Sequence, residues 1–180
     1  MIHLRELNIK DSKRMLDLMH DRSIQNCFKK NMNAMSLEDT EQFIQKFGNA
    51  RESLDCNRVL HLAIALDDND LYVGTVSLKN VDIISKNAEF AIVTMRECRG
   101  CGVGKEAMSN MLDIAFNRLQ LNKVYLNVIA NNITAISLYE KMNFRKEGYM
   151  RQQLMINGEY CDLIWYGLLK EEYYGEQQNG

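Results

Sequence analysis

The sequence predicts a single α/β (α+β) domain in which helices flank a mixed, mainly antiparallel sheet. The chain has 180 residues, of which 46% are hydrophobic and 26% charged, so it is long enough for one hydrophobic core and short for two. Strand-like apolar runs follow one another between residues 59 and 94, as in an antiparallel meander. From residue 103 onward helices and strands alternate, which indicates a parallel crossover at the centre of the sheet.

The first half of the chain is expected to contain one strand, two short helices and then three strands. Ser12 is a candidate N-cap for the first helix, and Ser36 and Asp39 have the spacing of a capping box for the second. A loop is expected at residues 53–58. The acidic run at 67–70 is a turn signal that makes a hairpin of two neighbouring strands. The expected strands are residues 1–8, 59–66, 71–78 and 88–94.

The clearest signal in the second half is an amphipathic helix at residues 103–119. Its apolar positions recur at helical spacing, and polar or charged residues fill the other side. A turn at Asn157 and Gly158 separates two closing strands. Residues 1–170 form the expected domain, and the polar residues 171–180 are expected to be a disordered tail. The remaining expected elements are a strand at 123–130, a helix at 133–142, and strands at 144–149 and 160–169.

Composition and charge exclude several classes of partner. The net charge of −2 and the isoelectric point near 6.0 carry no footprint for nucleic acid or for an anionic membrane. No apolar run reaches the about 18 residues of a membrane span. The odd number of cysteines, five, and the absence of a signal-like start favour the cytoplasm. Cys98 and Cys101 form one Cys-x-x-Cys pair, but a closed zinc site needs four ligands, so we expect no metal.

The most informative stretch is a glycine cluster between a predicted strand and the long predicted helix. Gly100, Gly102 and Gly104 allow close approach of the backbone to a ligand, and amides at a helix N-terminus attract an anion such as a pyrophosphate. Lys105 is followed by Glu106 rather than Ser or Thr, which argues against a Walker loop, and the G-x-G-x-G spacing departs from the dinucleotide-binding fingerprint. The alternative is that these glycines only turn the chain into the helix.

Two motifs, in this order, resemble those of the GNAT acetyltransferases. Residues 99–104 read R-x-x-G-x-G, which resembles the family's CoA-binding signature. Residues 132–144 read NITAISLYEKMNF, which is similar to the second motif N-x-x-A-x-x-L-Y-x-K-x-G-F. The resemblance covers about residues 59–169, with two departures: no proline precedes the glycine loop, and Asn143 replaces a glycine. Asparagine is the next best residue after glycine in a left-handed conformation, so we expect the second departure to be tolerated.

The resemblance implies that acetyl-CoA is the acyl donor and lies at a splayed parallel pair of strands. Ile92 and Thr94 would offer backbone groups to its pantetheine arm. The side chain of Arg99 would reach a phosphate or point to solvent, and Asn132 would bind the cofactor arm or cap the helix that follows it. The residues whose backbone amides would hold the pyrophosphate are Cys101, Gly102, Val103 and Gly104.

Two residues are candidates for proton transfer. Tyr139 occupies the position at which the family carries a tyrosine that protonates the departing thiolate, and its alternative is a core tyrosine. Glu89 lies where many members carry a glutamate that takes a proton from the amine directly or through water. Its alternatives are a ligand for the substrate cation and a surface carboxylate. His61, in an apolar strand, is expected to be packed rather than catalytic.

The expected function is therefore transfer of acetyl from CoA to a primary amine, by direct attack in a ternary complex. The expected acceptor is a small molecule such as a polyamine or amino sugar, or a protein N-terminus. Carboxylates at Asp67, Asp68, Asp70 and Glu89 are available for a cation. The alternative is a non-catalytic module that binds or senses acyl-CoA, and the sequence leaves a homodimer open.

Overall fold

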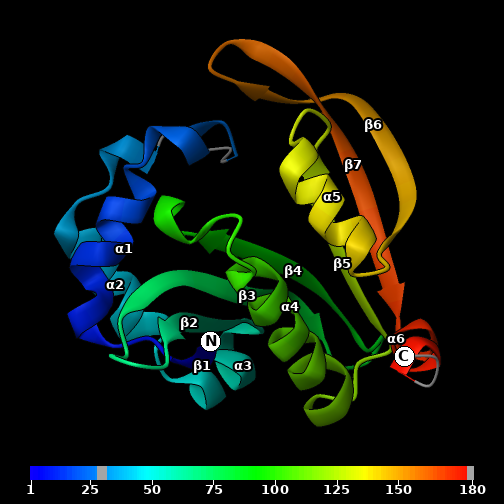
Figure 1. The fold of residues 1–180 in the computed structure, drawn as a ribbon, viewed down its shortest axis with the longest axis horizontal. Coiled ribbons are helices and arrows are strands. Elements are labelled where there is room, and N and C mark those ends of the chain that lie inside the picture. The colour runs from blue at the N-terminus through cyan, green and yellow to red at the C-terminus, as the bar shows by residue number, and fades with distance from the viewer. Residues whose placement is uncertain (28–31, 178–180) are drawn as a thin grey trace.

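A computed structural model describes residues 1–27 and 32–177. Within these segments seven strands form one sheet in the order β1-β2-β3-β4-β5-β7-β6 (Figure 1). The central pair β4 and β5 is parallel and the other neighbours are antiparallel, which confirms the mixed, mainly antiparallel sheet. The strands are β1 (Ile2–Glu6), β2 (Leu60–Leu66), β3 (Tyr72–Asp82), β4 (Asn87–Thr94), β5 (Lys123–Ile129), β6 (Arg145–Ile156) and β7 (Glu159–Leu169).

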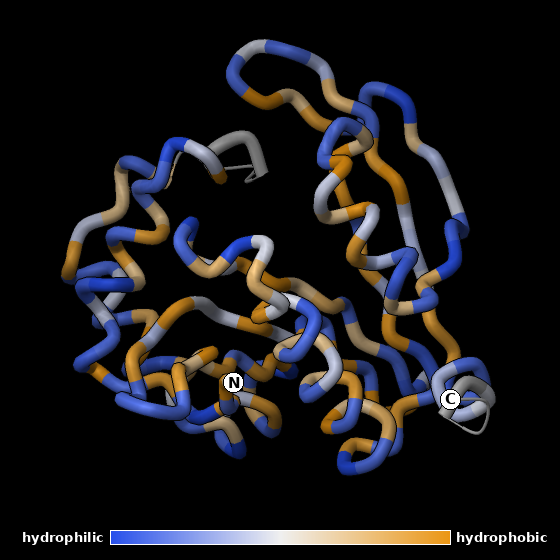
Figure 2. The backbone as a smooth tube through the Cα atoms, viewed as in Figure 1, coloured by the Kyte–Doolittle hydropathy of each residue, from blue (hydrophilic) through white to orange (hydrophobic). Residues whose placement is uncertain are grey.

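Helices cover both faces of this sheet. Apolar side chains of α3, α4 and α5 share one core cluster with β2 to β5 and β7, and α1 and α2 pack in a second cluster on the opposite face. Hydrophobic segments run through the interior, whereas many of the outer loops are hydrophilic (Figure 2). The α-helices are α1 (Ser12–Met19), α2 (Leu37–Phe47), α3 (Ala50–Asn57), α4 (Val103–Asp113), α5 (Ile133–Lys141) and α6 (Lys170–Gln177). The short helical turns are η1 (Ile9–Asp11), η2 (Arg22–Cys27), η3 (Met32–Ala34), η4 (Arg96–Cys98) and the π-helical η5 (Ile114–Arg118).

One of the two predicted helix starts is correct. The amide of Asp39 donates to Ser36 Oγ at 3.1 Å, and the amide of Ser36 donates to Asp39 Oδ2 at 2.7 Å, which confirms the capping box of α2. The prediction that Ser12 caps the first helix is wrong. Asn8 and Asp11 form their own capping box around η1, which leads directly into α1. The helical path therefore starts four residues earlier than a cap at Ser12 would place it.

The loop expected at residues 53–58 is also wrong, because α3 occupies most of it. Asn49 caps α3 by accepting from the amide of Glu52 at 3.0 Å, and the helix ends at Arg58, whose φ of 56° is left-handed. Ser53 points into the core and is fully buried. With Leu54 it is one of few inward-facing residues of α3, so the apolar periodicity of a longer helix is missing.

The predicted disordered tail differs from the structure over residues 171–177, which belong to α6. The amide of Leu169 donates to Glu172 Oε2 at 2.9 Å, so a side chain caps the start of this helix. The ring of Tyr173 lies 4.9 Å from that of Phe116. One aromatic contact with the core and one cap therefore order a segment whose composition is polar. Residues 178–180 of the predicted tail lie outside the described part of the chain.

Two turns follow the predicted chemistry. Asn143 has a φ of 65°, which confirms that asparagine takes the left-handed position after α5. Asn157 and Gly158, with φ of 52° and 84°, form the tight turn between β6 and β7.

Among the described residues, no helix combines the length and apolar character that crossing a bilayer requires.

Candidate active site

The site lies where the two parallel strands of the sheet separate. β4 and β5 pair only from Asn87 with Lys123 to Glu89 with Tyr125. Beyond these residues β4 continues to pair with β3, and β5 with β7, so the strands diverge toward their carboxyl ends. Figure 1 shows α4 and α5 on the two sides of this divergence. The sheet therefore has an internal edge where a continuous ladder would otherwise run.

The free edge of β4 presents backbone groups toward the diverging partner. The amide of Met95 donates to Val73 O in β3 at 2.8 Å. Because backbone groups of alternate residues in a strand point to opposite edges, those of Ile92 and Thr94 point away from β3 and toward the splay. The carbonyl of Thr94 accepts from Arg99 Nε at 3.2 Å and from Nη2 at 3.0 Å, which supports this orientation.

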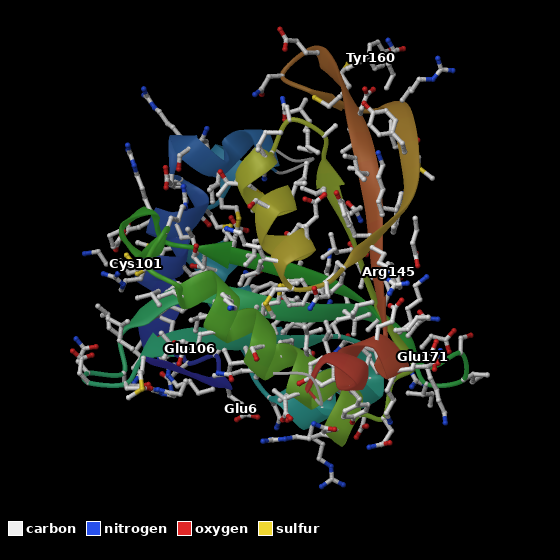
Figure 3. All side chains as sticks on the ribbon, turned by 45° about the vertical axis from the view of Figure 1, so that its right-hand side comes forward. Glu6, Cys101, Glu106, Arg145, Tyr160 and Glu171 are labelled. Carbon is white, nitrogen blue, oxygen red and sulfur yellow. The ribbon has the colours of Figure 1, made fainter. Side chains whose placement is uncertain are left out.

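The glycine loop brings a helix N-terminus to the same end of β4. Gly100 and Gly102 have φ of 78° and 85°, a region that suits glycine. No side chain of the described residues caps α4 at Gly102, so the amides of its first turn are available to an anion. A Cβ added at Gly104 would lie 3.6 Å from Leu138 Cδ2 of α5, so the bare backbone of Gly104 faces the space between the two helices. Cys101 lies at the exposed tip of this loop (Figure 3).

Tyr139 projects from α5 into the core cluster beneath the two helices. It is 8% exposed, and its ring centroid lies 6.3 Å from that of Phe144 and 6.4 Å from that of Tyr166. The hydroxyl of Tyr166 donates to Glu140 Oε1 at 3.0 Å, and burial raises the pKa of Tyr166 above its ordinary value. Tyr139 thus sits in an aromatic environment on the face of the sheet that carries α4 and α5.

Glu89 lies at the vertex of the splay and points to the opposite face. Its neighbours Ala88 and Phe90 belong to the core beneath α4, so strand alternation directs Glu89 toward the side of α1 and α2. The carboxylate is 15% exposed and accepts three hydrogen bonds. The donors are Lys79 Nζ at 2.8 Å and Asn127 Nδ2 at 3.1 Å to Oε1, and Asn80 Nδ2 at 2.9 Å to Oε2.

A profile described as the Acetyltransferase (GNAT) domain matches residues 2–145. This chain belongs to the GNAT acetyltransferase family. A spermidine N(1)-acetyltransferase of Vibrio cholerae is 35% identical to it over 101 residues, which are 56% of this chain and 58% of that protein. The SPbeta prophage-derived N-acetyltransferase YokL of Bacillus subtilis is 29% identical over 75% of this chain and 77% of that protein.

Solved structures match this GNAT domain over nearly its full length. A spermidine N-acetyltransferase from Vibrio cholerae, in complex with CoA and spermine, superposes with a TM-score of 0.83 at 26% identity, and the match covers 96% of this chain and 98% of that one. In sequence, the chain spans little more than half the length of the curated spermidine acetyltransferases that it matches. The predicted fold and family are therefore confirmed.

The structure places two further predicted residues of the GNAT motifs in specific contacts. Asn132 accepts from the amide of Ala135 at 3.2 Å, so it caps α5, as one of its two expected roles requires. Arg99 does not point to solvent. Besides Thr94 O, it donates to Ser23 Oγ at 2.7 Å and to Asp21 Oδ2 at 3.2 Å.

His61 is packed, as expected. Its Nδ1 lies 2.7 Å from Ser77 Oγ, and its ring lies 5.0 Å and 5.3 Å from the rings of Phe43 and Phe47. Burial, with a smaller effect of the Lys79 charge, lowers the pKa of His61 to about 4. The imidazole is therefore neutral at pH 7 and a weak base.

The acidic turn after β2 does not contribute carboxylates to the splay. Asp70 accepts from Lys10 Nζ at 2.5 Å and from Arg5 Nε at 2.6 Å, and His3 bridges Asp67 and Asp70. These partners, Lys10 first, hold the pKa of Asp70 well below its ordinary value. The expectation that this turn offers carboxylates to a cationic acceptor is corrected for Asp70, because Lys10 and Arg5 already compensate its charge.

The cysteine pair shows no arrangement for metal binding in the described part of the chain. Cys98 and Cys101 are free thiols, and burial raises the pKa of Cys98 above its ordinary value. Within residues 1–27 and 32–177, no group of three or more His, Cys, Asp or Glu side chains is placed to hold a metal ion.

Sequence reasoning missed the partners of the two charged site residues. Lys79 and Asn127 contact Glu89, and Asp21 and Ser23 contact Arg99. Strand periodicity places Lys79 on the same face of the sheet as His61. It does not give the register between β3 and β4, which brings Lys79 opposite Glu89. The partners of Arg99 lie more than 70 residues away in the chain, where no local pattern identifies them.

Proposed function

We propose that this GNAT domain is an acetyl-CoA-dependent N-acetyltransferase that moves acetyl to a primary amine in a ternary complex. The observation that carries the proposal is the combination of an open edge of β4 with an uncapped N-terminus of α4 at its end. A linear ligand with amides along its length and a pyrophosphate at one end fits both features. Family membership and the CoA-bound structural neighbour support the same ligand.

The N-terminus of α4 and the open edge of β4 would each bind a different part of CoA. The amides of residues 101–104 would hold the pyrophosphate, and the backbone of Ile92 would bond the pantetheine arm. Thr94 would contribute its N–H, because its carbonyl already accepts twice from Arg99. The acetyl thioester supplies the activated acyl group, and the protein orients it toward the vertex between β4 and β5.

Tyr139 would act as the general acid toward the departing thiolate. A phenol is protonated at neutral pH and can donate to the sulfur as the C–S bond breaks. The place of Tyr139 on the cofactor-side face of the sheet supports this role over one in acceptor binding.

Glu89 would take the proton of the attacking amine through a water molecule. An ionised carboxylate offers about four acceptor positions, and three are occupied by Lys79, Asn80 and Asn127. One position is left, which suits a single water better than direct contact with a bulky amine. The three fixed donors would hold the carboxylate in one orientation at the vertex of the splay.

Glu89→Gln tests this role. We expect kcat/KM at pH 7 to fall by about 10²-fold, as on loss of a general base. The deficit should shrink as pH rises, because a larger share of the amine is then unprotonated. The measurement is the pH profile of kcat/KM, with CoA affinity as the control. A deficit that is the same at every pH would mean that Glu89 only holds the vertex together.

We propose an acceptor with a primary amine on a small molecule, or a free protein N-terminus, rather than a lysine in a folded protein. The support is Glu89 on the α1 and α2 face of the splay, together with the spermidine acetyltransferases among the relatives. Aromatic side chains on the same face, Tyr125 and Trp165 with ring centroids 5.8 Å apart, would line a path for a cation.

An acceptor screen tests the function as a whole. Free thiol release from acetyl-CoA would be followed with spermidine, spermine, amino sugars, aminoglycosides, short peptides with free N-termini, and intact proteins with blocked N-termini. We expect turnover with at least one small amine or peptide. Turnover only with internal lysines would contradict the acceptor assignment. CoA binding without turnover on any amine would favour the non-catalytic acyl-CoA module.

A further inference from the structure

Arg99 opens the glycine motif, yet its side chain folds back from the loop. Its guanidinium donates twice to Thr94 O, at 3.2 Å and 3.0 Å, and so closes the η4 turn. It then reaches Ser23 Oγ at 2.7 Å and Asp21 Oδ2 at 3.2 Å. The side chains of Arg99 and Asp21 are 31% and 20% exposed, so the ion pair is partly shielded from water.

The side-chain partners of Arg99 belong to the opposite face of the sheet. Asp21 and Ser23 follow α1, which packs on the face away from α4 and α5. The amide of Ser23 donates to Asp21 Oδ1 at 2.8 Å. Hydrogen bonds from Ser23, and then the charges of Arg99 and Arg96, lower the pKa of Asp21 below its ordinary value, so this carboxylate is ionised at neutral pH.

A second contact joins the same two regions. Arg14 of α1 donates from Nε to Tyr72 O at 2.7 Å and from Nη2 to Glu97 Oε1 at 3.1 Å. Glu97 lies in η4, two residues before Arg99. Two ion pairs, Arg99 with Asp21 and Arg14 with Glu97, therefore connect residues 96–104, the cofactor loop, with α1 and the turn that follows it.

These contacts argue against a phosphate as the main partner of Arg99. A guanidinium has five N–H donors in a fixed plane, and here donors on all three nitrogens are directed at a carbonyl, a hydroxyl and a carboxylate. A cation that is already paired with a carboxylate adds little net charge for a second anion. The guanidinium of Arg99 cannot turn toward the N-terminus of α4 without breaking these hydrogen bonds.

We propose that Arg99 is a positioning residue that couples the cofactor loop to the acceptor side of the domain. This inference rests on the proposed function, in which the acceptor approaches from the face of the sheet that carries Glu89, α1 and α2. Through Asp21 and Ser23, Arg99 fixes the turn after α1 relative to the end of β4. A change in the loop on CoA binding is thereby transmitted to the segment that borders the acceptor.

Arg99→Gln and Asp21→Asn, singly and together, test this coupling with spermidine as the probe amine. We expect each single variant to raise the KM for spermidine by about tenfold, with kcat and CoA affinity changed less than about threefold. The double variant should be no worse than either single one, because both remove the same interaction. A loss of CoA affinity of about tenfold in Arg99→Gln, with none in Asp21→Asn, would instead assign Arg99 to a phosphate and overturn the proposal.

A second measurement does not depend on the acceptor. Amide hydrogen exchange at residues 20–24 should slow when CoA binds the wild-type protein, and this protection should be lost in Arg99→Gln. Arg96→Gln is the matched control, because it removes an equal charge from an exposed side chain three residues earlier. Protection retained in Arg99→Gln would overturn the coupling. Normal protection with no turnover on any amine would contradict the proposed function and leave the coupling intact.

Discussion

Tyr139→Phe should lower kcat by about 10²-fold or more, with acetyl-CoA affinity changed only a few fold. The substitution removes one hydroxyl and keeps the ring that packs near Phe144 and Tyr166. If the phenol protonates the departing thiolate, its loss acts on the transition state and spares ground-state binding. Steady-state kinetics across the pH range, together with calorimetric titration of CoA, would measure both quantities.

Tyr166→Phe is the matched control for this experiment. Tyr166 is also buried in the same cluster, and its hydroxyl bonds Glu140. Its loss should cost about 1 kcal/mol of folding free energy, the usual contribution of one hydrogen bond. We expect kcat to remain near the wild-type value. If both variants lose activity equally, or if Tyr139→Phe keeps its full kcat while folded, Tyr139 is a packing residue.

Gly104→Val should weaken CoA binding by about 10- to 10²-fold, equivalent to about 1–3 kcal/mol, because its side chain would occupy the space in which the bare backbone can approach a pyrophosphate. Gly104 lies in the first turn of α4, and its missing Cβ faces Leu138 across the space between α4 and α5. Gly102→Val should have a similar effect for another reason. There is room for a Cβ at Gly102, but its φ of 85° is strained for valine and would shift the loop amides.

Gly104→Ala separates cofactor binding from folding. Alanine is favoured over glycine in a helix by about 1 kcal/mol, so the variant should keep or raise its melting temperature while CoA affinity falls. Gly175→Ala, in α6, is the matched control and should leave CoA affinity unchanged, because nothing lies within 4 Å of its added Cβ. Unchanged CoA affinity in folded Gly104→Val and Gly102→Val variants would contradict the pyrophosphate assignment.

Local patterns predicted most of this fold. The long helix, the three-strand meander and the turn at Asn157 and Gly158 each depend on neighbours in sequence, so periodicity and turn chemistry revealed them. The failures have equally local causes. Asn8 provides a cap four residues before the predicted one, and α3 buries too few side chains to show an amphipathic pattern.

The candidate site also has one part that local sequence patterns predict and another part that depends on contacts between distant segments. The glycine loop could be predicted because three glycines before an amphipathic helix have a direct meaning for the backbone. The environments of Glu89 and Arg99 could not, because they arise from strand register and from contacts between distant segments. Lys79 and Asn127 meet at Glu89 only because β3, β4 and β5 lie side by side.

The divergence of β4 from β5 also has a consequence for what can enter the molecule. An unpaired strand edge ordinarily invites another polypeptide strand, and proteins protect such edges against aggregation. Here the edge is in the middle of a sheet, flanked by α4 and α5, which approach each other at Gly104 and Leu138. A chain without side chains at regular intervals can follow such an edge, whereas a polypeptide strand carries side chains on both faces. The two flanking helices would therefore protect this edge from pairing with a neighbour's strand.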